Sequence, residues 1–422
     1  MRFRQDMCHN LTPRAASILK AKTFEERNYI NTIFLYLCAM KTLVLIVYSL
    51  VIVLIDVWVL LALRRNKNSV GMWLYGAFAV AIDVLPYILY FAKLQPLVGI
   101  YCAYVYMIVS LIKIGMAVGE FLDRRFSKRR HVWRKASIVL CSAFVIFMLC
   151  GSIVPLQSIE VKKVELQFKS LPEGFDGVRI GLFSDAHLGS LPVGSKQLQR
   201  MVDEFNAAGC LFVVNGGDLI NIRTSELTDE YREILCGIEA PVYSVIGNHD
   251  LGYYRSDTLE YSVAQSTADI KRAIDELGWI RLDNQSRWVH NGSDSILITG
   301  VEFDHAMADL RHTRGVRSAA LDSLVAAVDS SAFNIVVSHI PQYWNSICGT
   351  HAGDLTLSGH THAMQFKIGD WSPASWMYDQ WGGLYESGEH KLYVSEGLGY
   401  AGIPFRLGSR PQITIFTLRK CE

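Results

Sequence analysis

Residues whose side chains could bind a metal ion follow five short apolar runs in the second half of the chain. The runs read VRIGLFS, LFVVNG, PVYSVIG, FNIVVS and DLTLSG. The candidate ligands that come directly after them are Asp185, His187, Asp218, Asn248, His339, His360 and His362. Carboxylate, amide and imidazole groups suit divalent manganese, zinc or iron, and the lack of cysteine in the set disfavours a thiolate-rich site. We therefore expect a metal centre, in which two ions about 3.5–4 Å apart could clamp a phosphoryl group.

The elements that must position these ligands are strands. From about residue 158, β-branched runs alternate with helix-like segments, which is typical of an α/β domain with a layered sheet. Ligands of such domains collect at the carboxyl ends of the strands, so the five motifs should converge on one rim. Glycines 217, 247 and 359 stand directly before ligands and indicate tight backbone turns.

Three further residues have candidate roles around this rim. Asp250, two positions after Asn248, is expected to orient a neighbouring group rather than to bind an ion. Arg223 and Arg406 are candidates for binding a substrate phosphate through paired donors, although arginines are common on any protein surface.

The five motifs, taken in order, resemble the signature of the calcineurin-like metallophosphoesterase superfamily: D-x-H, G-D, G-N-H-[DE], H and G-H-x-H. The spacing of the motifs and the C-terminal text YVSEGLGYAGIPFRLGSRPQITIFTL are most similar to the membrane-tethered bacterial phosphodiesterases. The resemblance covers roughly residues 165–420 and implies a four-layer αββα sandwich. Many relatives read G-H-T-H-G-G-Q, whereas this chain has Ala363 and Met364 at the two glycine positions, a departure that touches no ligand.

The resemblance also implies a role for each residue. It assigns Asp185, His187 and His362 to one ion, Asn248, His339 and His360 to the other, and Asp218 to both. A water bridging the two ions would be the hydroxide nucleophile. His249 is similar to the superfamily histidine that protonates the leaving oxygen; the alternative is that it only braces its loop.

The first 157 residues have the composition of a membrane domain. Four apolar segments, at roughly 42–63, 70–92, 97–119 and 137–156, are each long enough to cross a bilayer. The linkers after the first and third are basic, which places them in the cytoplasm and the soluble half on the extracytoplasmic side of an inner or cytoplasmic membrane. Asp56, Asp83, Lys113 and Glu120 lie in or near these segments, where charges are either functional or paired.

These observations divide the chain into three parts. We expect an N-terminal extension at 1–39, whose start codon is open to question, a membrane domain at 40–157 and a phosphoesterase domain at 158–422. The third part, residues 158–422, holds 22 Lys and Arg against 33 Asp and Glu. Because a nucleic-acid-binding surface is basic, nucleic acid is not an expected partner. The nine cysteines show no CxxC spacing and predict neither a zinc ribbon nor a disulfide framework.

The expected function is metal-dependent hydrolysis of a phosphodiester or phosphomonoester by a membrane-anchored enzyme. The expected substrate is a phosphorylated small molecule or lipid, displayed on a lipid or an envelope polymer, and membrane lipids are expected partners. One alternative is a UDP-2,3-diacylglucosamine pyrophosphatase-type enzyme of lipid A synthesis, which needs a cytoplasm-facing site. Another is a non-catalytic metal-binding scaffold. The segment 371–388, rich in Trp and Tyr, either touches the membrane interface or packs as a lid on its own domain.

Overall fold

The structure is a computed structural model. It describes residues 48–61, 64, 69–91, 96–127, 131–153, 159–191, 196–252, 262–304, 321–322, 325, 328–329, 331–348, 350 and 352–421. The expected extension at 1–39 and the basic linker residues Arg65 and Lys67 lie outside these ranges. Chain contacts define two compact units, which we call the helical unit (1–92 with 105–141) and the sheet unit (93–104 with 142–422). The domain boundary expected at 157–158 stays a prediction.

The predicted membrane segments are helical wherever the structure describes them. A first helix covers residues 48–61, followed by α3 (Ser69–Phe91), α4 (Pro96–Phe126) and α5 (Val132–Ile153). Among the described residues, two stretches are both long and apolar enough to cross a membrane, Tyr101–Phe126 and Val132–Ile153, and the apolar stretches Tyr48–Leu61 and Val70–Leu85 are shorter. The expected count of four transmembrane helices is therefore not confirmed.

The charges predicted inside the helical unit are paired. Lys113 donates to Asp56 at 2.8 Å and to Asp83 at 3.0 Å, and Tyr75 donates to the second oxygen of Asp56 at 2.5 Å. Asp56 and Lys113 are almost fully buried. Glu120 accepts from Arg124 one helical turn later, at 2.8 Å. One ammonium group, that of Lys113, therefore faces two carboxyl groups, those of Asp56 and Asp83.

The sheet unit contains two six-stranded sheets. The first has the order β1-β12-β2-β3-β4-β5. Its strands are β1 (Glu160–Phe168), β12 (Gln412–Lys420), β2 (Arg179–Phe183), β3 (Phe212–Asn215), β4 (Val242–Ser244) and β5 (Ile280–Arg281). All neighbouring strands pair in parallel except β12 with β2, which are antiparallel. The strand order places β12 between β1 and β2.

The second sheet has the order β10-β11-β9-β8-β7-β6. Its strands are β10 (Gly383–Ser387), β11 (His390–Val394), β9 (Leu355–Ser358), β8 (Asn334–Ser338), β7 (Asp294–Val301) and β6 (Ser286–Asn291). The four central strands are parallel, and an antiparallel hairpin partner closes each edge.

Alternate residues of the strands face two different cores. On β2, Ile180 and Leu182 belong to the core between the sheets, whereas Phe183 packs on the outer side. On β8, Ile335 and Val337 face the same inner core. This alternation follows from the two-residue period of a strand, and strands buried on both faces read as continuous apolar runs. The sequence runs that predicted strands are of this kind.

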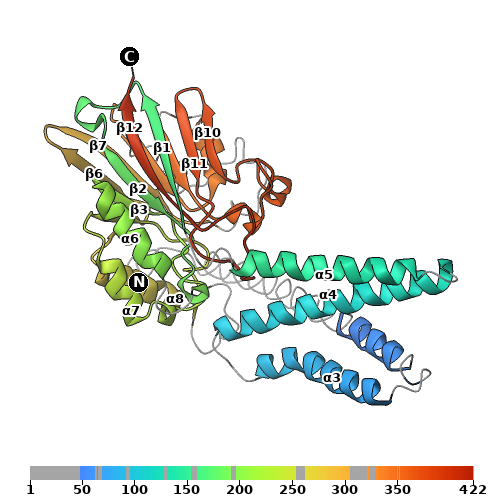
Figure 1. Cartoon of the computed structure of the whole chain (residues 1–422). Helices are drawn as coiled ribbons and strands as arrows, with labels where there is room; N and C mark the ends of the chain where they lie inside the picture. The colour runs from blue at the N-terminus through green and yellow to red at the C-terminus, as the bar shows by residue number, and fades with distance from the viewer. Residues whose placement is uncertain are drawn as a thin grey trace, which may run out of the picture. The chain divides into compact units, whose positions relative to one another are not determined.

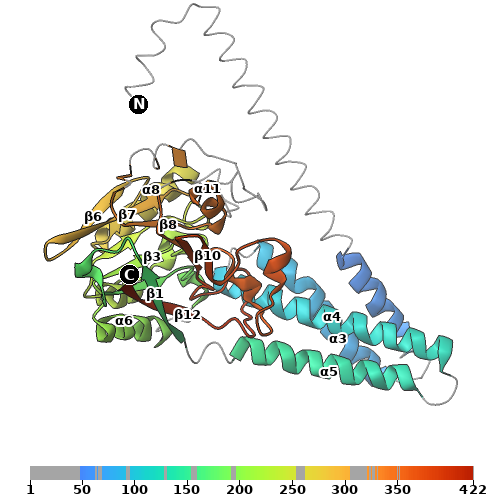
Figure 2. The ribbon, with the colours of Figure 1, turned by 90° about the horizontal axis from the view of Figure 1, so that it is seen from above.

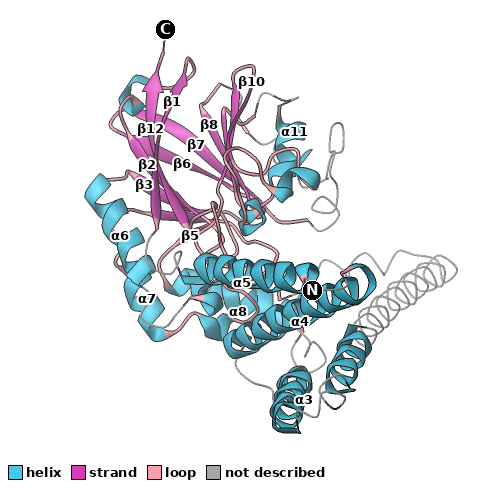
Figure 3. Cartoon of the chain, turned by 45° about the vertical axis from the view of Figure 1, so that its right-hand side comes forward, coloured by secondary structure: helices cyan, strands magenta, loops and turns pink. Residues whose placement is uncertain are grey.

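Helices cover the outer faces, as Figures 1 and 3 show. The helices are α6 (Lys196–Ala208), α7 (Asp229–Cys236), α8 (Val263–Glu276) and the short α11 (Trp344–Ile347). Figure 2 shows α6 and α11 on opposite sides of the pair of sheets. Helix α8 begins at a capping box, in which Ser262 accepts from the Gln265 backbone and the Gln265 side chain accepts in return. The α/β sandwich with two sheets is confirmed.

Single 3₁₀ turns occupy the connections. They are η2 (Glu173–Phe175), η3 (Leu188–Ser190), η4 (Thr224–Glu226), η5 (Pro341–Tyr343), η6 (His362–Gln365) and η7 (Pro373–Trp376). Turns η3 and η6 begin at or next to predicted ligands, His187 and His362. These two connections therefore place candidate metal ligands as well as joining strands.

Candidate metal centre

The structure brings all seven predicted ligands together. Three of the strands that lead to them, β2, β3 and β4, belong to the first sheet, and β8 and β9 belong to the second. The carboxyl ends of these parallel strands meet at one rim of the sandwich. His360 is half-buried, and the other six ligands are fully buried: Asp185, His187, Asp218, Asn248, His339 and His362.

The ligand atoms form two groups that share one carboxylate. In the first, His362 Nε2 lies 3.0 Å from His187 Nε2 and 3.4 Å from Asp185 Oδ1. Asp218 Oδ2 lies 3.8 Å from His187 Nε2, on the side facing the second group. Ligand atoms of one ion lie about 3 Å apart when each is about 2.0–2.2 Å from it, so this spacing fits a metal ion.

The second group surrounds Asn248. Its Oδ1 lies 3.0 Å from both His339 Nε2 and His360 Nδ1. His339 Nε2 is also 3.2 Å from Asp218 Oδ2, the oxygen that faces the first group. Asp218 therefore stands between the two groups, where a carboxylate can offset the repulsion between two cations.

Burial keeps two imidazoles of the first group neutral. It lowers the pKa of His187 to about 3 and holds the pKa of His362 well below its ordinary value. A neutral imidazole has one nitrogen with a free lone pair, which is the form that binds metals. The proton between the facing Nε2 atoms of His187 and His362 would leave when an ion binds there. The donor set of the first group thus fits a divalent ion.

The ligand backbones are held in a conformation that favours glycine. The φ angles are 54° at Asp185, 43° at His187, 56° at Asp218, 74° at His360 and 52° at His362. Left-handed backbone at residues other than glycine costs about 1–3 kcal/mol each and collects at functional sites. Backbone hydrogen bonds hold two of them, from Asp185 N to Gly217 O at 2.8 Å and from His187 N to Asp218 O at 3.1 Å.

Two glycines are required because neighbouring ligand carboxylates approach them closely. A Cβ atom on Gly359 would lie 2.2 Å from Asp185 Oδ2, and one on Gly247 would lie 2.1 Å from Asp218 Oδ1. No side chain fits at such distances. The glycines that the sequence places before ligands therefore make room for the ligands of other motifs.

Carboxylates outside the ligand set hold the loops. Asp250 is buried and accepts the backbone N–H groups of Asp218, Ile220 and Gly247 at 2.9–3.1 Å. Burial, together with the charge of Asp218, raises the pKa of Asp250 to about 7. Its expected role, orienting neighbours, agrees with this geometry. Glu226 does the same for the loop after Asp218, and no sequence motif pointed to it.

His249 lies beside the first ligand group, its ring edge-to-face with His187 at 4.7 Å between centroids. Its Nδ1 donates to the carbonyl of Asn221 at 2.7 Å, so Nε2 is the nitrogen available for chemistry. Its backbone N–H donates to Asp218 Oδ1 at 2.8 Å. The ring is thus oriented by one loop and anchored to the shared carboxylate.

The two arginines predicted to bind phosphate have different surroundings. Arg406 is fully buried and donates to the carbonyls of Gly399 and Glu396 at 2.6–2.9 Å; burial lowers its pKa to about 10. Its Nη2 also lies 2.9 Å from His362 Nδ1. This geometry favours bracing of His362 over gripping a substrate. Arg223 is exposed just before η4, and its substrate role stays a prediction.

Aromatic rings form a wall on the His360 side. The Tyr378 ring lies edge-to-face with His360 at 5.9 Å, and the Phe303 ring lies 6.2 Å from His339 and 6.3 Å from His360. Tyr378 comes from the Trp- and Tyr-rich segment that the sequence singled out. Phe303 follows β7 with no motif around it, so sequence reasoning missed it.

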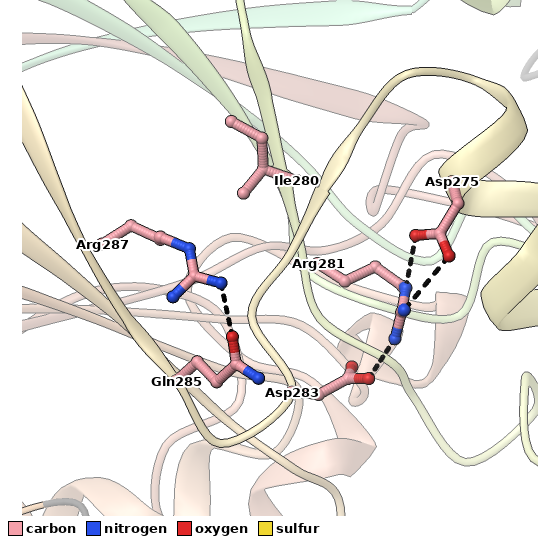
Figure 4. Close-up of a pocket in the computed structure, with 6 residues that line it drawn as sticks. All are labelled: Asp275, Ile280, Arg281, Asp283, Gln285 and Arg287. Atoms are coloured by element: carbon pink, nitrogen blue, oxygen red, sulfur yellow. Dashed lines mark hydrogen bonds and ion pairs between the residues drawn. The ribbon is translucent and has the colours of Figure 1, made fainter.

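A separate pocket of about 320 Å³ lies at the strand β5, and Figure 4 shows its lining. Arg281 makes ion pairs with Asp275 and Asp283 there, and Arg287 donates to Gln285 at 2.5 Å. None of the predicted site residues lines it. Because both arginines are engaged with neighbours, this pocket does not compete with the rim as a phosphate site.

Fold and site together define a class: an α/β sandwich whose strand ends hold Asp, Asn and His ligands for metal ions. The family model for calcineurin-like phosphoesterases matches residues 178–364, which include all seven candidate ligands from Asp185 to His362. The chain therefore carries a calcineurin-like metallophosphoesterase domain and is a metal-dependent phosphoesterase.

Curated relatives point the same way. A "Transmembrane protein with metallophosphoesterase domain" from Danio rerio is 29% identical over 335 residues, covering 75% of this chain and 71% of the relative. The "Uncharacterized metallophosphoesterase YkuE" of Bacillus subtilis is 28% identical over 269 residues, covering 62% and 86%. With the two long apolar helices, the first relative indicates membrane association.

Among solved structures, a phosphopantetheinyl hydrolase from Mycobacterium tuberculosis matches with a TM-score of 0.36 and 14% identity. The match covers 54% of this chain and 91% of that one. A likeness of this strength carries no argument about substrate.

Proposed function

We propose that this protein is a membrane-anchored two-metal phosphoesterase that hydrolyses phosphodiester or phosphomonoester bonds. One observation carries the proposal: the Asp218 carboxylate lies between two sets of potential ligands, with Oδ2 3.8 Å from His187 Nε2 and 3.2 Å from His339 Nε2. The metals we propose are two divalent ions of manganese, zinc or iron, since the nitrogen and oxygen donors suit all three.

When bound, such a pair of ions supplies a hydroxide nucleophile at neutral pH and stabilises charge on the phosphoryl oxygens. The protein's own part is to hold the geometry. Asp218 holds the two ligand groups at a fixed separation, and its position is set by Asp250 and by the N–H of His249. His249 Nε2 is the group that we assign to protonating the leaving oxygen, because Nδ1 is engaged with Asn221.

For the substrate we propose a phosphoester carried by a lipid or an envelope component. The observation that supports this class is membrane association, which keeps the rim near membrane-borne phosphates. The basic linkers support an extracytoplasmic position of the metal centre. The acidic balance of the sheet-forming half argues against nucleic acid.

The test uses the full chain in detergent with Mn²⁺ or Zn²⁺ and two chromogenic esters, bis-p-nitrophenyl phosphate and p-nitrophenyl phosphate. Asp218→Ala should lose turnover and bound metal, while Asp203→Ala, an exposed change on α6, should keep both. The preferred ester assigns the bond type. A wild-type protein that binds no metal, or an Asp218→Ala variant that turns over normally, would refute the proposal.

A further inference from the structure

Large apolar side chains are exposed on the loops that follow the last metal ligand. Ile368 and Trp376 are 65% and 66% exposed, values far above those of the packed core. Together with their exposed neighbours they form what we call the apolar loop surface: Met364, Ile368, Trp371, Trp376, Met377 and Ile403. A water-soluble face seldom leaves so many large apolar groups together. The exposure also argues against a lid packed on its own domain.

A chain of ring contacts connects this surface to the apolar helix α5. The Phe147 ring of α5 packs edge-to-face on Phe366, with 6.0 Å between centroids. Phe366 in turn contacts Trp371 at 6.4 Å, and Trp371 contacts Trp376 at 5.6 Å. The second half of α5, from Ser142, belongs to the same compact unit as these loops. The surface is therefore continuous with one face of the helix.

A second set of contacts holds the neighbouring loop to the end of α5. The backbone N–H of Arg406 donates to the carbonyl of Gly151 at 2.8 Å. The Phe405 ring packs on Phe147 at 5.2 Å, and it stands so close to Gly151 that a Cβ there would lie 2.1 Å from the ring. The contact between helix and loops is thus built by backbone and side chains together.

The position of Phe147 along α5 sets the depth of the loops. The helix ends at Ile153, six residues after Phe147, which corresponds to about 9 Å at 1.5 Å per residue. A bilayer core is about 30 Å thick, and the headgroup zone on each side adds about 5–8 Å. If α5 crosses the membrane from end to end, loops that pack beside its last 9 Å lie in the boundary between headgroups and acyl chains.

We propose that the apolar loop surface inserts into the headgroup zone of the membrane that α5 crosses. Trp is favoured in that zone because its ring is apolar with one polar N–H, and Ile and Met bury apolar area there. Insertion explains why these side chains are left exposed by the protein itself. The occupant of the surface is therefore the lipid bilayer.

The same loops reach the metal centre, which gives the insertion a consequence. Met364 and the ligand His362 share turn η6, and Arg406 contacts both Gly151 of α5 and His362 Nδ1. Insertion therefore sets the height of the metal centre above the lipid surface. This inference rests on the proposed function. The height of the metal centre would favour phosphoesters at the level of the lipid headgroups over phosphoesters dissolved in bulk water.

The direct test of insertion is fluorescence quenching of the full chain in nanodiscs made of phosphatidylcholine and phosphatidylglycerol. Lipids brominated at carbons 6 and 7 quench shallow indoles, and lipids brominated at carbons 11 and 12 quench deep ones. The double variant Trp371→Phe/Trp376→Phe should lose a component that shallow bromines quench. Trp288→Phe, a matched control at an exposed tryptophan on β6, should lose only unquenched emission. Equal quenched amplitude in wild type and double variant would overturn the proposal.

A second measurement separates this proposal from the proposed function. Ile368→Glu/Trp376→Glu should raise the apparent KM for phosphatidic acid in nanodiscs about tenfold. It should leave turnover of soluble bis-p-nitrophenyl phosphate unchanged. If the wild type hydrolyses neither ester, the proposed function fails while the quenching result still judges insertion. If insertion is lost and the KM for phosphatidic acid is unchanged, the height-setting role is refuted.

Discussion

The backbone N–H of Asp218 donates to the carboxylate of Asp250 at 2.9 Å. The return contact runs from the N–H of His249 to Asp218 Oδ1 at 2.8 Å. The two motifs that contain these residues follow neighbouring parallel strands, β3 and β4. Two hydrogen bonds, one to its backbone and one to its carboxylate, therefore tie Asp218 to the loop that carries Asn248 and His249.

Asp250→Ala should destabilise the protein and loosen the metal centre. The substitution leaves three buried N–H groups without their acceptor, and each such group costs about 1–3 kcal/mol. We expect a loss of at least about 3 kcal/mol of unfolding free energy and a fall in bound metal, measured by thermal unfolding and elemental analysis. Asp203→Ala is the control, within about 0.5 kcal/mol of wild type. Full metal content in Asp250→Ala would contradict the expectation.

Gly359→Ala should abolish metal binding by the first ligand group. The new methyl would lie 2.2 Å from Asp185 Oδ2 and 2.0 Å from the Ser184 hydroxyl, so the ligand must move. Metal content per chain should drop, and turnover of bis-p-nitrophenyl phosphate should fall at least about a hundredfold. Gly382→Ala, where the nearest atom is at 3.4 Å, should behave as wild type. Normal activity in Gly359→Ala would show that the site is wider than described.

Met364→Gly should stabilise the protein. Met364 has a φ of 46°, and relatives with the G-H-T-H-G-G-Q pattern have glycine there. Relief of left-handed strain is worth about 1 kcal/mol. Met364→Ala keeps the strain and serves as the comparison, so the glycine variant should unfold at the higher temperature of the two. If the alanine variant matches or exceeds it, the strain is absent.

Removal of metal should lower both activity and stability. Chelation should abolish turnover, and saturation at a hundred times Kd should restore about 2.7 kcal/mol of stability, since ions that bind only the folded state shift the equilibrium. Elemental analysis should return two ions per wild-type chain. A single ion at saturation, with full turnover, would contradict the shared role of Asp218.

Lys113→Met should destabilise the helical unit. It removes the ammonium group that faces the carboxylates of Asp56 and Asp83, and breaking a buried ion pair costs about 3–5 kcal/mol. Thermal unfolding of the full chain in nanodiscs measures the loss. Adding Asp83→Asn removes one of the stranded charges and should recover part of it. A Lys113→Met variant as stable as wild type would mean that the cluster is hydrated.

Much of the sheet unit could be predicted because the information is local. Each motif sits at the end of a run buried on both faces, as at Phe183 and Asn215, and parallel strands bring such ends to one rim. The ligands, the glycines and the bracing by Asp250 follow from that rule. Neighbours that come from distant loops do not: Glu226 and Phe303 look like any surface acid or core ring in the sequence.

Hydropathy identified four apolar stretches, and two of them have full spanning length within the described residues, so the count of four stays a prediction. Arg406 shows a limit of local reasoning. Its residue type suggested a phosphate-binding role, but its guanidinium is buried and donates to the carbonyls of Glu396 and Gly399. The burial of one side chain depends on how loops pack, which neither hydrophobic periodicity nor motif spacing in the sequence predicts.

The place of β12 has a consequence for synthesis of the protein on the ribosome. β12 lies between β1 and β2, although its first residue, 412, follows that of β1 by 252 positions and that of β2 by 233. Until residues 412–420 leave the exit tunnel, β1 has no partner in the sheet, and its unpaired edge stays open to other chains. The first sheet therefore cannot be completed before residues 412–420 have been synthesised, and a truncation before residue 412 would leave β1 without its partner strand.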